Sequence, residues 1–270
     1  MEIIGERING MFSDIKQAII DENPEAVVKW AVKQTEMGAA WLDISVGASA
    51  ADPRKALKFL IEASQGAVDT PLSLDSTNYD LIEEGLELCR QPPLINSCHA
   101  DRHKIERVFP MAIKYGAKVI GLAMSEDSGI PKTSDERVAL AMELVAAADE
   151  YGLPMRDLYI DPLLLPINVA QDHFVEALET LRQVKLMADP SPKAVCGLSN
   201  TSQRCAHRNI INRTALVMLI GAGLDAAIAN ASDVDLMDAA ATARVLLNKE
   251  IYCDSYADLF KAPRYKIFGA

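Results

Sequence analysis

Short apolar segments of the sequence repeatedly end at carboxylate, amide or hydroxyl side chains. Three of them end at Asp75, Asn96 and Asp161, and residues 195–200 (VCGLSN) pass from an apolar run to a hydroxyl and an amide. Buried parallel strands are apolar throughout, and the loops that follow them commonly carry binding groups. Carboxylates and amides without Lys or His suit a neutral heterocycle rich in N–H and C=O groups, whereas a phosphate would need Gly-rich amides and cations. The pattern predicts a binding site for such a heterocycle.

Each of these residues also has an ordinary structural interpretation. Asp75 could cap a helix, and Asn96 could fix a turn. The site is favoured because polar groups recur at most of the apolar segments' ends. The further examples are Glu6, Arg7, Asn9, Asp43, Ser45, Ser97, Ser125 and Asn230.

The elements that must hold these side chains alternate along the chain. Strands are predicted at 3–8, 41–45, 71–75, 93–96, 118–123, 158–161, 193–198 and 225–229. Helices are predicted at 24–37, 53–66, 80–90, 101–115, 133–151, 173–187, 211–221 and 234–248, with a short amphipathic tail at 256–261. Eight such units in 270 residues predict an α/β fold, a single-domain (β/α)8 TIM barrel spanning residues 1–270. A doubly wound sheet is the alternative, but no GxGxxG turn is present.

Composition restricts the function classes. The net charge of -11 argues against nucleic-acid binding and against an anionic membrane surface, and no apolar run is long enough to span a bilayer. Five scattered Cys without a CxxC pair favour reduced thiols and a cytoplasmic location. His99 and His103 have a spacing that could bind zinc on one helix face, but no third ligand stands out, so no metal site is predicted.

Five segments in order resemble one family. They are residues 3–10 (IIGERING), 74–78 (LDSTN), 95–97 (INS), 159–162 (YIDP) and 197–200 (GLSN). The chain is similar to the pterin-binding barrel methyltransferases, in particular the methyltetrahydrofolate:corrinoid iron–sulfur protein methyltransferase family. The resemblance covers nearly the whole chain, whereas residues 125–128 and 264–270 depart from the family pattern.

The resemblance implies a role for each matching residue. Asp75, Asn96 and Asp161 would hold the pterin ring. Asn200 would lie near the methyl-bearing nitrogen and act in catalysis. Arg208 would lie near the folate tail or the docked corrinoid. The complete substrate-binding set implied by the family is Asp75, Asn96, Asp161, Gly197, Ser199, Asn200, Arg208 and Ile228.

The resemblance also implies the chemistry. The N5-methyl group of methyltetrahydrofolate would move by an SN2-type displacement to a Co(I) corrinoid, with Asn200 assisting by a hydrogen bond at the pterin nitrogen. No DxHxxG cobalamin motif occurs in the sequence, so the corrinoid (cobalamin) is expected on a separate partner protein, with a corrinoid iron–sulfur protein as one candidate. A homodimer is also implied by the resemblance.

Three alternatives remain open at this point. The physiological direction could be reversed, from a methylcorrinoid protein to tetrahydrofolate as in demethylation pathways. A dihydropteroate-synthase-like enzyme would share the pterin site, but it needs a pyrophosphate pocket and a basic strand-end residue that residues 197–200 do not supply. A non-catalytic folate-binding or assembly subunit would not require the complete set of polar residues.

Overall fold

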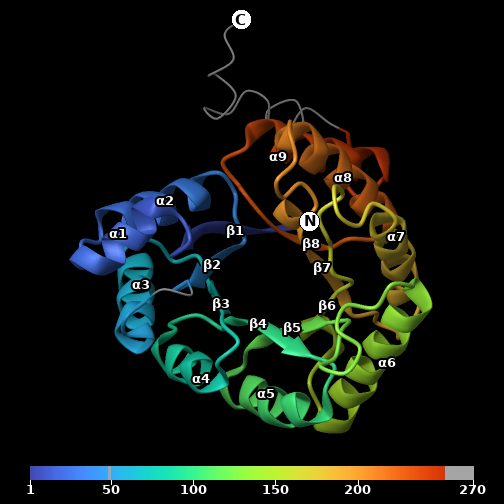
Figure 1. Ribbon diagram of the computed structural model, residues 1–270, viewed down its shortest axis with the longest axis horizontal. Helices are drawn as coiled ribbons and strands as arrows, with labels where there is room; N and C mark the ends of the chain where they lie inside the picture. The colour runs from blue at the N-terminus through green and yellow to red at the C-terminus, as the bar shows by residue number, and fades with distance from the viewer. Residues whose placement is uncertain (48–49, 253–270) are drawn as a thin grey trace, which may run out of the picture.

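The computed structural model describes residues 1–47 and 50–252, so the tail predicted at 256–261 and the segment 264–270 lie outside the described residues. Eight parallel strands close into a barrel in chain order (Figure 1). They are β1 (Glu2–Asn9), β2 (Trp41–Ser45), β3 (Leu72–Asp75), β4 (Leu94–His99), β5 (Lys118–Leu122), β6 (Leu158–Asp161), β7 (Lys193–Gly197) and β8 (Ala226–Ala229). The predicted TIM barrel is therefore confirmed.

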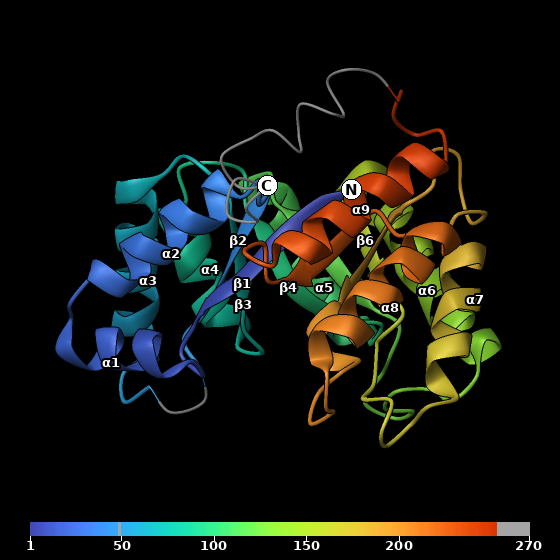
Figure 2. The ribbon, with the colours of Figure 1, turned by 90° about the horizontal axis from the view of Figure 1, so that it is seen from above.

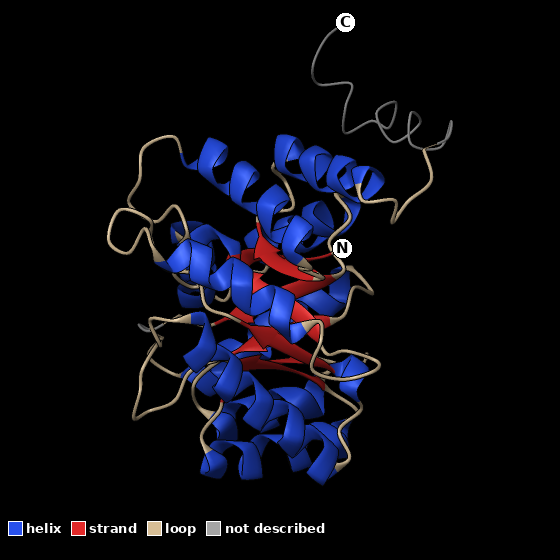
Figure 3. Ribbon diagram, turned by 90° about the vertical axis from the view of Figure 1, so that its right-hand side faces the viewer, coloured by secondary structure: helices blue, strands red, loops and turns tan. Residues whose placement is uncertain are grey.

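Helices surround this barrel on its outside (Figures 1 and 3). They are α1 (Ser13–Asp21), α2 (Glu25–Glu36), α3 (Pro53–Ala67), α4 (Tyr79–Leu88), α5 (Arg102–Tyr115), α6 (Ser134–Tyr151), α7 (His173–Val184), α8 (Arg208–Ala222) and α9 (Val234–Leu246). Within the described ranges, no helix is both long and apolar enough to cross a membrane.

Most predicted boundaries agree with the structure to within a few residues, and the predicted caps account for two of them. The Asp52 side chain accepts hydrogen bonds from the first turn of α3, and Thr133 with Glu136 forms the expected capping box of α6. Helix α1 was not predicted, because its start at Phe12 has no side-chain cap. Helix α8 begins three residues before the predicted start at 211.

Seven of the strands each contribute one side chain to an inner cluster that fills the barrel interior. Its members are Ile4, Trp41, Leu94, Ile120, Tyr159, Val195 and Ala226. Side chains alternate between the two faces of a strand, so the residue two positions later on each strand again faces inward, one layer closer to the carboxyl end. The register of the barrel thereby fixes which side chains form its mouth.

The amino-terminal end of the barrel holds a hydrogen-bonded group that includes Tyr159 of the inner cluster. Tyr159 Oη donates to Glu2 Oε2 at 2.8 Å, and Lys193 Nζ contacts Glu2 Oε1 at 2.6 Å and Tyr159 Oη at 2.9 Å. Figure 2 shows β1 running away from the N-terminus toward the opposite edge of the molecule, where the strands end. Ligand access therefore falls to the carboxyl ends of the strands, as in other TIM barrels.

Candidate active site

The barrel mouth is lined by the inward-facing residues that follow those of the inner cluster along the strands. Asn96, Asp161, Gly197 and Ile228 each follow a member of this cluster by two positions. Asp75 follows Ser73, whose hydroxyl points to the same interior. The structure therefore brings five of the sequence-predicted residues to one end of one barrel.

The same alternation adds two carboxyl groups that the sequence-based selection did not include. Glu6 follows Ile4 by two positions on β1, and Asp43 follows Trp41 by two positions on β2. Both are among the polar residues at the ends of the apolar segments in the sequence. The period of two, counted from the apolar residue inside the barrel, is the signal that would have selected them.

Asp43 is the centre of a hydrogen-bonded group at the floor of the mouth. Its Oδ1 accepts from Ser73 Oγ at 2.7 Å and from Asn96 Nδ2 at 3.2 Å, and only 5% of the residue is exposed. Burial, followed by the nearby carboxyl of Asp75, raises the pKa of Asp43. Burial also raises the pKa of Asp75, against a hydrogen bond from Ser45. This end of the site therefore holds carboxyl groups that take up a proton more readily than usual.

Asp161 is held by the backbone that follows it. Leu163 N donates to Asp161 Oδ1 at 2.7 Å, and Leu163 has the left-handed φ of 67°, which is uncommon for a residue other than glycine. Burial raises the pKa of Asp161 to about 7, although backbone hydrogen bonds from Leu163 and Gly197 act in the opposite direction. The position of this carboxyl thus depends on the conformation of the segment after β6.

Arg137 of α6 fixes that segment. The residue has no exposed surface, and its guanidinium donates to Pro131 O at 3.0 Å, to Pro162 O at 3.0 Å and to Leu163 O at 3.3 Å. It also contacts His173 Nδ1 at 2.9 Å, and since the guanidinium can only donate, this nitrogen accepts. Arg137 therefore positions Asp161 without being part of the mouth.

Replacing Arg137 by Lys is expected to weaken both folding and ligand binding. The ammonium retains the charge but cannot serve four acceptors, and each buried acceptor left without a partner costs about 1–3 kcal/mol. We expect a free energy of unfolding lowered by a few kcal/mol and weaker binding of the folate that the family resemblance implies, measured by denaturant titration and calorimetry. Arg182→Lys on α7 is the control, because its ion pair with Glu179 is exposed. Unchanged folate affinity in a folded Arg137→Lys protein would contradict the positioning role.

The end of β7 places two further predicted residues in the short helical turn η2 (Leu198–Asn200). Ser199 Oγ donates to Glu6 Oε1 of β1 at 2.9 Å, past the end of β8, which lies between the two strands. Arg208, at the start of α8, donates to Ser199 O at 3.1 Å and to Ser202 Oγ at 3.1 Å. Asn200 is exposed, and its amide lies directly over Gly197. All eight residues of the predicted set therefore lie on or beside the carboxyl ends of the strands.

Gly197 leaves the space that the Asn200 amide occupies. A Cβ on Gly197 would lie 2.9 Å from Asn200 Nδ2 and would meet no other group closely. Because Gly197 has a φ of -78°, alanine causes no backbone strain there. Gly197→Ala is expected to fold with unchanged thermal stability while displacing Asn200 and slowing the methyl transfer that the family resemblance implies, compared by melting curves and steady-state kinetics. Gly66→Ala, at an open position on α3, is the control. Normal turnover in Gly197→Ala would contradict this dependence on the amide position.

The two histidines considered for zinc do not share a helix. His99 is the last residue of β4, whereas His103 lies on α5. The helix-face zinc arrangement considered for them is therefore wrong. Within residues 1–47 and 50–252, no group of three or more His, Cys, Asp or Glu side chains could hold a metal ion.

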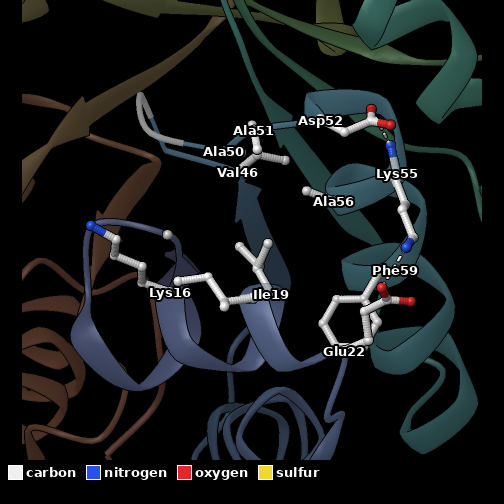
Figure 4. A pocket seen from close by; sticks show the side chains of 12 residues that line it. Lys16, Ile19, Glu22, Val46, Ala50, Ala51, Asp52, Lys55, Ala56 and Phe59 are labelled. Carbon is white, nitrogen blue, oxygen red and sulfur yellow. Dashed lines mark hydrogen bonds and ion pairs between the residues drawn. The ribbon is translucent and has the colours of Figure 1, made fainter.

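A separate cavity of 460 Å³ lies between α1 and α3, beside the ends of β1 and β2. Figure 4 shows Ile19, Val46 and Phe59 among its largely apolar walls, with the Lys55–Glu22 ion pair at one side and Lys16 at the other. None of the predicted site residues line it. The polar groups that the sequence singled out belong to the barrel mouth instead.

Comparison with known proteins agrees with this placement. The model of the family described as pterin binding enzyme matches residues 5–230. The chain is 27% identical to the methylcorrinoid:tetrahydrofolate methyltransferase of Eubacterium limosum, over 97% of this chain and 96% of the relative. It is 28% identical to the methionine synthase of Mycobacterium tuberculosis over 86% of this chain, which spans only 20% of that longer protein.

Solved structures share the barrel. The dihydropteroate synthase FolP of Clostridium difficile, determined in the presence of pteroic acid, superposes with a TM-score of 0.65 at 18% identity, over 91% of this chain and 96% of the other. The Xanthomonas albilineans dihydropteroate synthase, in complex with 7,8-dihydropteroate, gives 0.63 at 17% identity, over 91% and 93%. At such identities the likeness establishes the fold alone. Because the family model spans the barrel from β1 to the end of β8, the chain belongs to the pterin binding enzymes.

Proposed function

We propose that this pterin-binding enzyme is a methyltransferase that moves the N5-methyl group between methyltetrahydrofolate and the Co(I) corrinoid of a separate protein. The observation that carries the proposal is the set of inward-facing polar residues above the inner cluster, with Asp75, Asn96 and Asp161 converging on one mouth. The likeness to a methylcorrinoid:tetrahydrofolate methyltransferase over nearly the full length of both chains supports the reaction class.

The pterin ring is the part of the substrate that these groups suit. Its exocyclic amine and ring N–H groups can donate to the carboxylates of Asp75 and Asp161, and its carbonyl can accept from an amide such as Asn96. Gly197 supplies a wall without a side chain, and Ile228 supplies an apolar contact. Arg208 lies at the outer edge of the mouth, where the folate tail leaves the barrel.

Asn200 acts where the bond breaks. A methyl group on a tertiary amine is displaced with difficulty, because the nitrogen takes the electron pair of the breaking bond. A hydrogen bond that strengthens as charge builds on this nitrogen stabilises the transition state more than the ground state, and so raises kcat. The side-chain amide of Asn200 can donate and accept, so it can follow the changing protonation of the nitrogen.

The corrinoid is the second substrate, and the chain receives it on a partner protein, for which a corrinoid iron–sulfur protein is one candidate. The partner docks over the carboxyl ends of the strands, because the methyl group must be approached in line with its bond to nitrogen. Both directions of transfer use the same contacts. The name of the Eubacterium limosum relative, methylcorrinoid:tetrahydrofolate methyltransferase, gives the direction from methylcorrinoid to tetrahydrofolate.

A spectroscopic assay tests the proposal. The purified protein is mixed with free reduced cobalamin and methyltetrahydrofolate, and in a second experiment with methylcobalamin and tetrahydrofolate, while the cobalt absorbance is followed. We expect transfer in both directions, faster than in protein-free controls. Absence of transfer in both would overturn the proposal. Formation of dihydropteroate from a pterin pyrophosphate and p-aminobenzoate would indicate the synthase reaction instead.

A further inference from the structure

Two glutamates face the barrel interior from the same strand in opposite electrostatic settings. Glu2 and Glu6 lie on β1, below and above Ile4 of the inner cluster. Glu2 is paired with Lys193 and hydrogen-bonded by Tyr159, and these contacts lower its pKa despite burial. Glu6 forms no ion pair within the described part of the chain, and burial raises its pKa. Two glutamates on one strand therefore differ: the environment of Glu2 favours the carboxylate, whereas burial of Glu6 favours the protonated carboxyl.

The two arginines whose charges act on Glu6, Arg7 and Arg208, form their direct contacts with other groups. Arg7 is stacked between Phe12 and Trp30 and pairs with Asp14 at 3.1 Å. Arg208 of α8 donates to Ser199 O and Ser202 Oγ, so it lowers the pKa of Glu6 only from a distance. The carboxyl of Glu6 also acts on Asp43 of β2, where the repulsion between two carboxylates raises the pKa of Asp43.

The backbone of β1 is built to present this residue. The pairing of β1 with β2 shifts between Gly5 and Ile8, which places Glu6 in a bulge. Buried Gln34 of α2 stabilises the bulge, because its Oε1 accepts from Arg7 N at 3.0 Å. Bulges are common beside active sites. Glu6 keeps the inward direction that alternation from Ile4 gives it, and its carboxyl accepts from the hydroxyl of Ser199 at 2.9 Å, next to Asn200.

We propose that Glu6 is the proton source for the pterin nitrogen and delivers its proton through the Ser199 hydroxyl. This inference rests on the proposed function and deepens it. Asn200 stabilises the nitrogen by a hydrogen bond, but an amide at neutral pH has no proton to give up. Glu6 supplies this proton, and the Ser199 hydroxyl passes it on to the nitrogen.

The step balances as follows. The bond between the methyl carbon and nitrogen breaks, its electron pair stays on nitrogen, and the new bond to the methyl carbon uses the electron pair of Co(I). When Glu6 is protonated, its carboxyl donates to Ser199 Oγ across the same 2.9 Å contact, so the hydroxyl is free to turn its own proton toward the nitrogen. The Ser199 hydroxyl then gives that proton to the nitrogen and takes the proton of the Glu6 carboxyl. Glu6 is left as the carboxylate and is reprotonated from solvent. In the reverse direction the carboxylate accepts the proton that tetrahydrofolate releases.

Glu6→Gln tests the proton transfer, because the amide oxygen can still accept from Ser199 but the titrating proton is gone. With methyltetrahydrofolate and free reduced cobalamin, we expect kcat to fall by about 100-fold or more and KM to change by less than about threefold. The wild-type rate should fall as pH rises through the pKa of Glu6, and Glu6→Gln should lose that limb. In the reverse direction the wild-type rate should instead rise as pH rises through the pKa of Glu6, because the carboxylate is then the form that accepts the proton. Asp43 and Asp161 still titrate in the variant, so the difference isolates Glu6.

A second set of variants separates a relay from a merely structural contact. Ser199→Ala should lower kcat, and the double variant with Glu6→Gln should be no slower than the worse single one, because both interrupt one path. Additive losses would contradict the relay. Glu2→Gln is the matched control: it removes a carboxylate from the same face of β1, should lower thermal stability, and should keep the wild-type pH profile.

The infrared difference spectrum between wild type and Glu6→Gln gives a readout that needs no turnover. It should contain the C=O band of a protonated carboxyl, and this band should disappear as the pH is raised through the pKa of Glu6. Two results would overturn the inference and leave the proposed function intact, provided that the wild-type protein transfers methyl groups. One is a Glu6→Gln variant with the normal rate and pH profile. The other is a difference spectrum without this band. A wild-type protein that transfers no methyl group would overturn both.

Discussion

Asn200→Ala is expected to retain the fold and to lose most methyl transfer. The substrate nitrogen would lose one hydrogen-bond donor that acts in the transition state, which costs roughly 3 kcal/mol, or about a hundredfold in kcat. Folate binding should weaken only modestly, since Asp75, Asn96 and Asp161 remain. Asn200 is exposed and its truncation leaves no buried group unpaired, so the free energy of unfolding should change by less than about 0.5 kcal/mol. Stopped-flow methyl transfer, calorimetry with methyltetrahydrofolate and denaturant titration measure these three quantities.

Two further variants sharpen this expectation. Asn200→Asp keeps the shape of the side chain but removes both amide donors, so it should be nearly as slow as the alanine variant. Gln203→Ala removes an exposed amide three residues later, where no role in the site is expected, and should keep the wild-type rate. A wild-type kcat in Asn200→Ala would remove this residue from the mechanism. A Kd for methyltetrahydrofolate raised as strongly as kcat is lowered would reassign it to binding.

The barrel was predictable because its signals are local. Apolar segments such as 158–161 end at a carboxylate, and caps such as Asp52 and the Thr133–Glu136 box begin helices where expected. Helix α1 begins without a side-chain cap and ends at Glu22 rather than at a glycine, so the residue types do not predict it. The extension of β4 to His99 could not be read from residue types, since its last residues are polar and continue the pairing with β5. Pairing between strands, which is non-local, decides such ends.

The site was predictable as a set of residues but not as a network. Residue order and the family resemblance identified Asp75, Asn96 and Asp161. That Asp43 joins Ser73 to Asn96, or that Glu6 reaches Ser199 across the strand between them, depends on the closure of the barrel. Arg137 had no signal at all, because an arginine near the start of a helix is ordinarily a solvated residue. Its role follows only from carbonyls contributed by two loops.

Asp161→Asn is expected to weaken folate binding strongly and to reduce the proton release that accompanies it. Before binding, burial raises the pKa of Asp161 to about 7, so the carboxyl is largely protonated at slightly acidic pH. Hydrogen bonds from the pterin N–H groups favour the carboxylate and lower this pKa in the complex. Binding near neutral pH should therefore release protons, and affinity should fall as pH drops below about 7. Charge-assisted hydrogen bonds contribute about 1.5–3 kcal/mol, which corresponds to roughly a 10- to 150-fold increase in Kd for the asparagine variant.

Calorimetry in buffers of different ionisation enthalpy measures both quantities, and stability against pH provides an independent check. The unfolded carboxyl has its pKa near about 3.9, below that of the folded state. As pH rises from about 4 to 7, the unfolded state therefore releases its proton first, and Asp161 makes the folded protein progressively less stable. Asp161→Asn removes that contribution and should be less sensitive to pH over this range. Asp157→Asn, on the half-exposed turn before β6, is the control for both measurements. Unchanged affinity together with the flattened stability profile would mean that Asp161 is buried as inferred but does not hold the pterin.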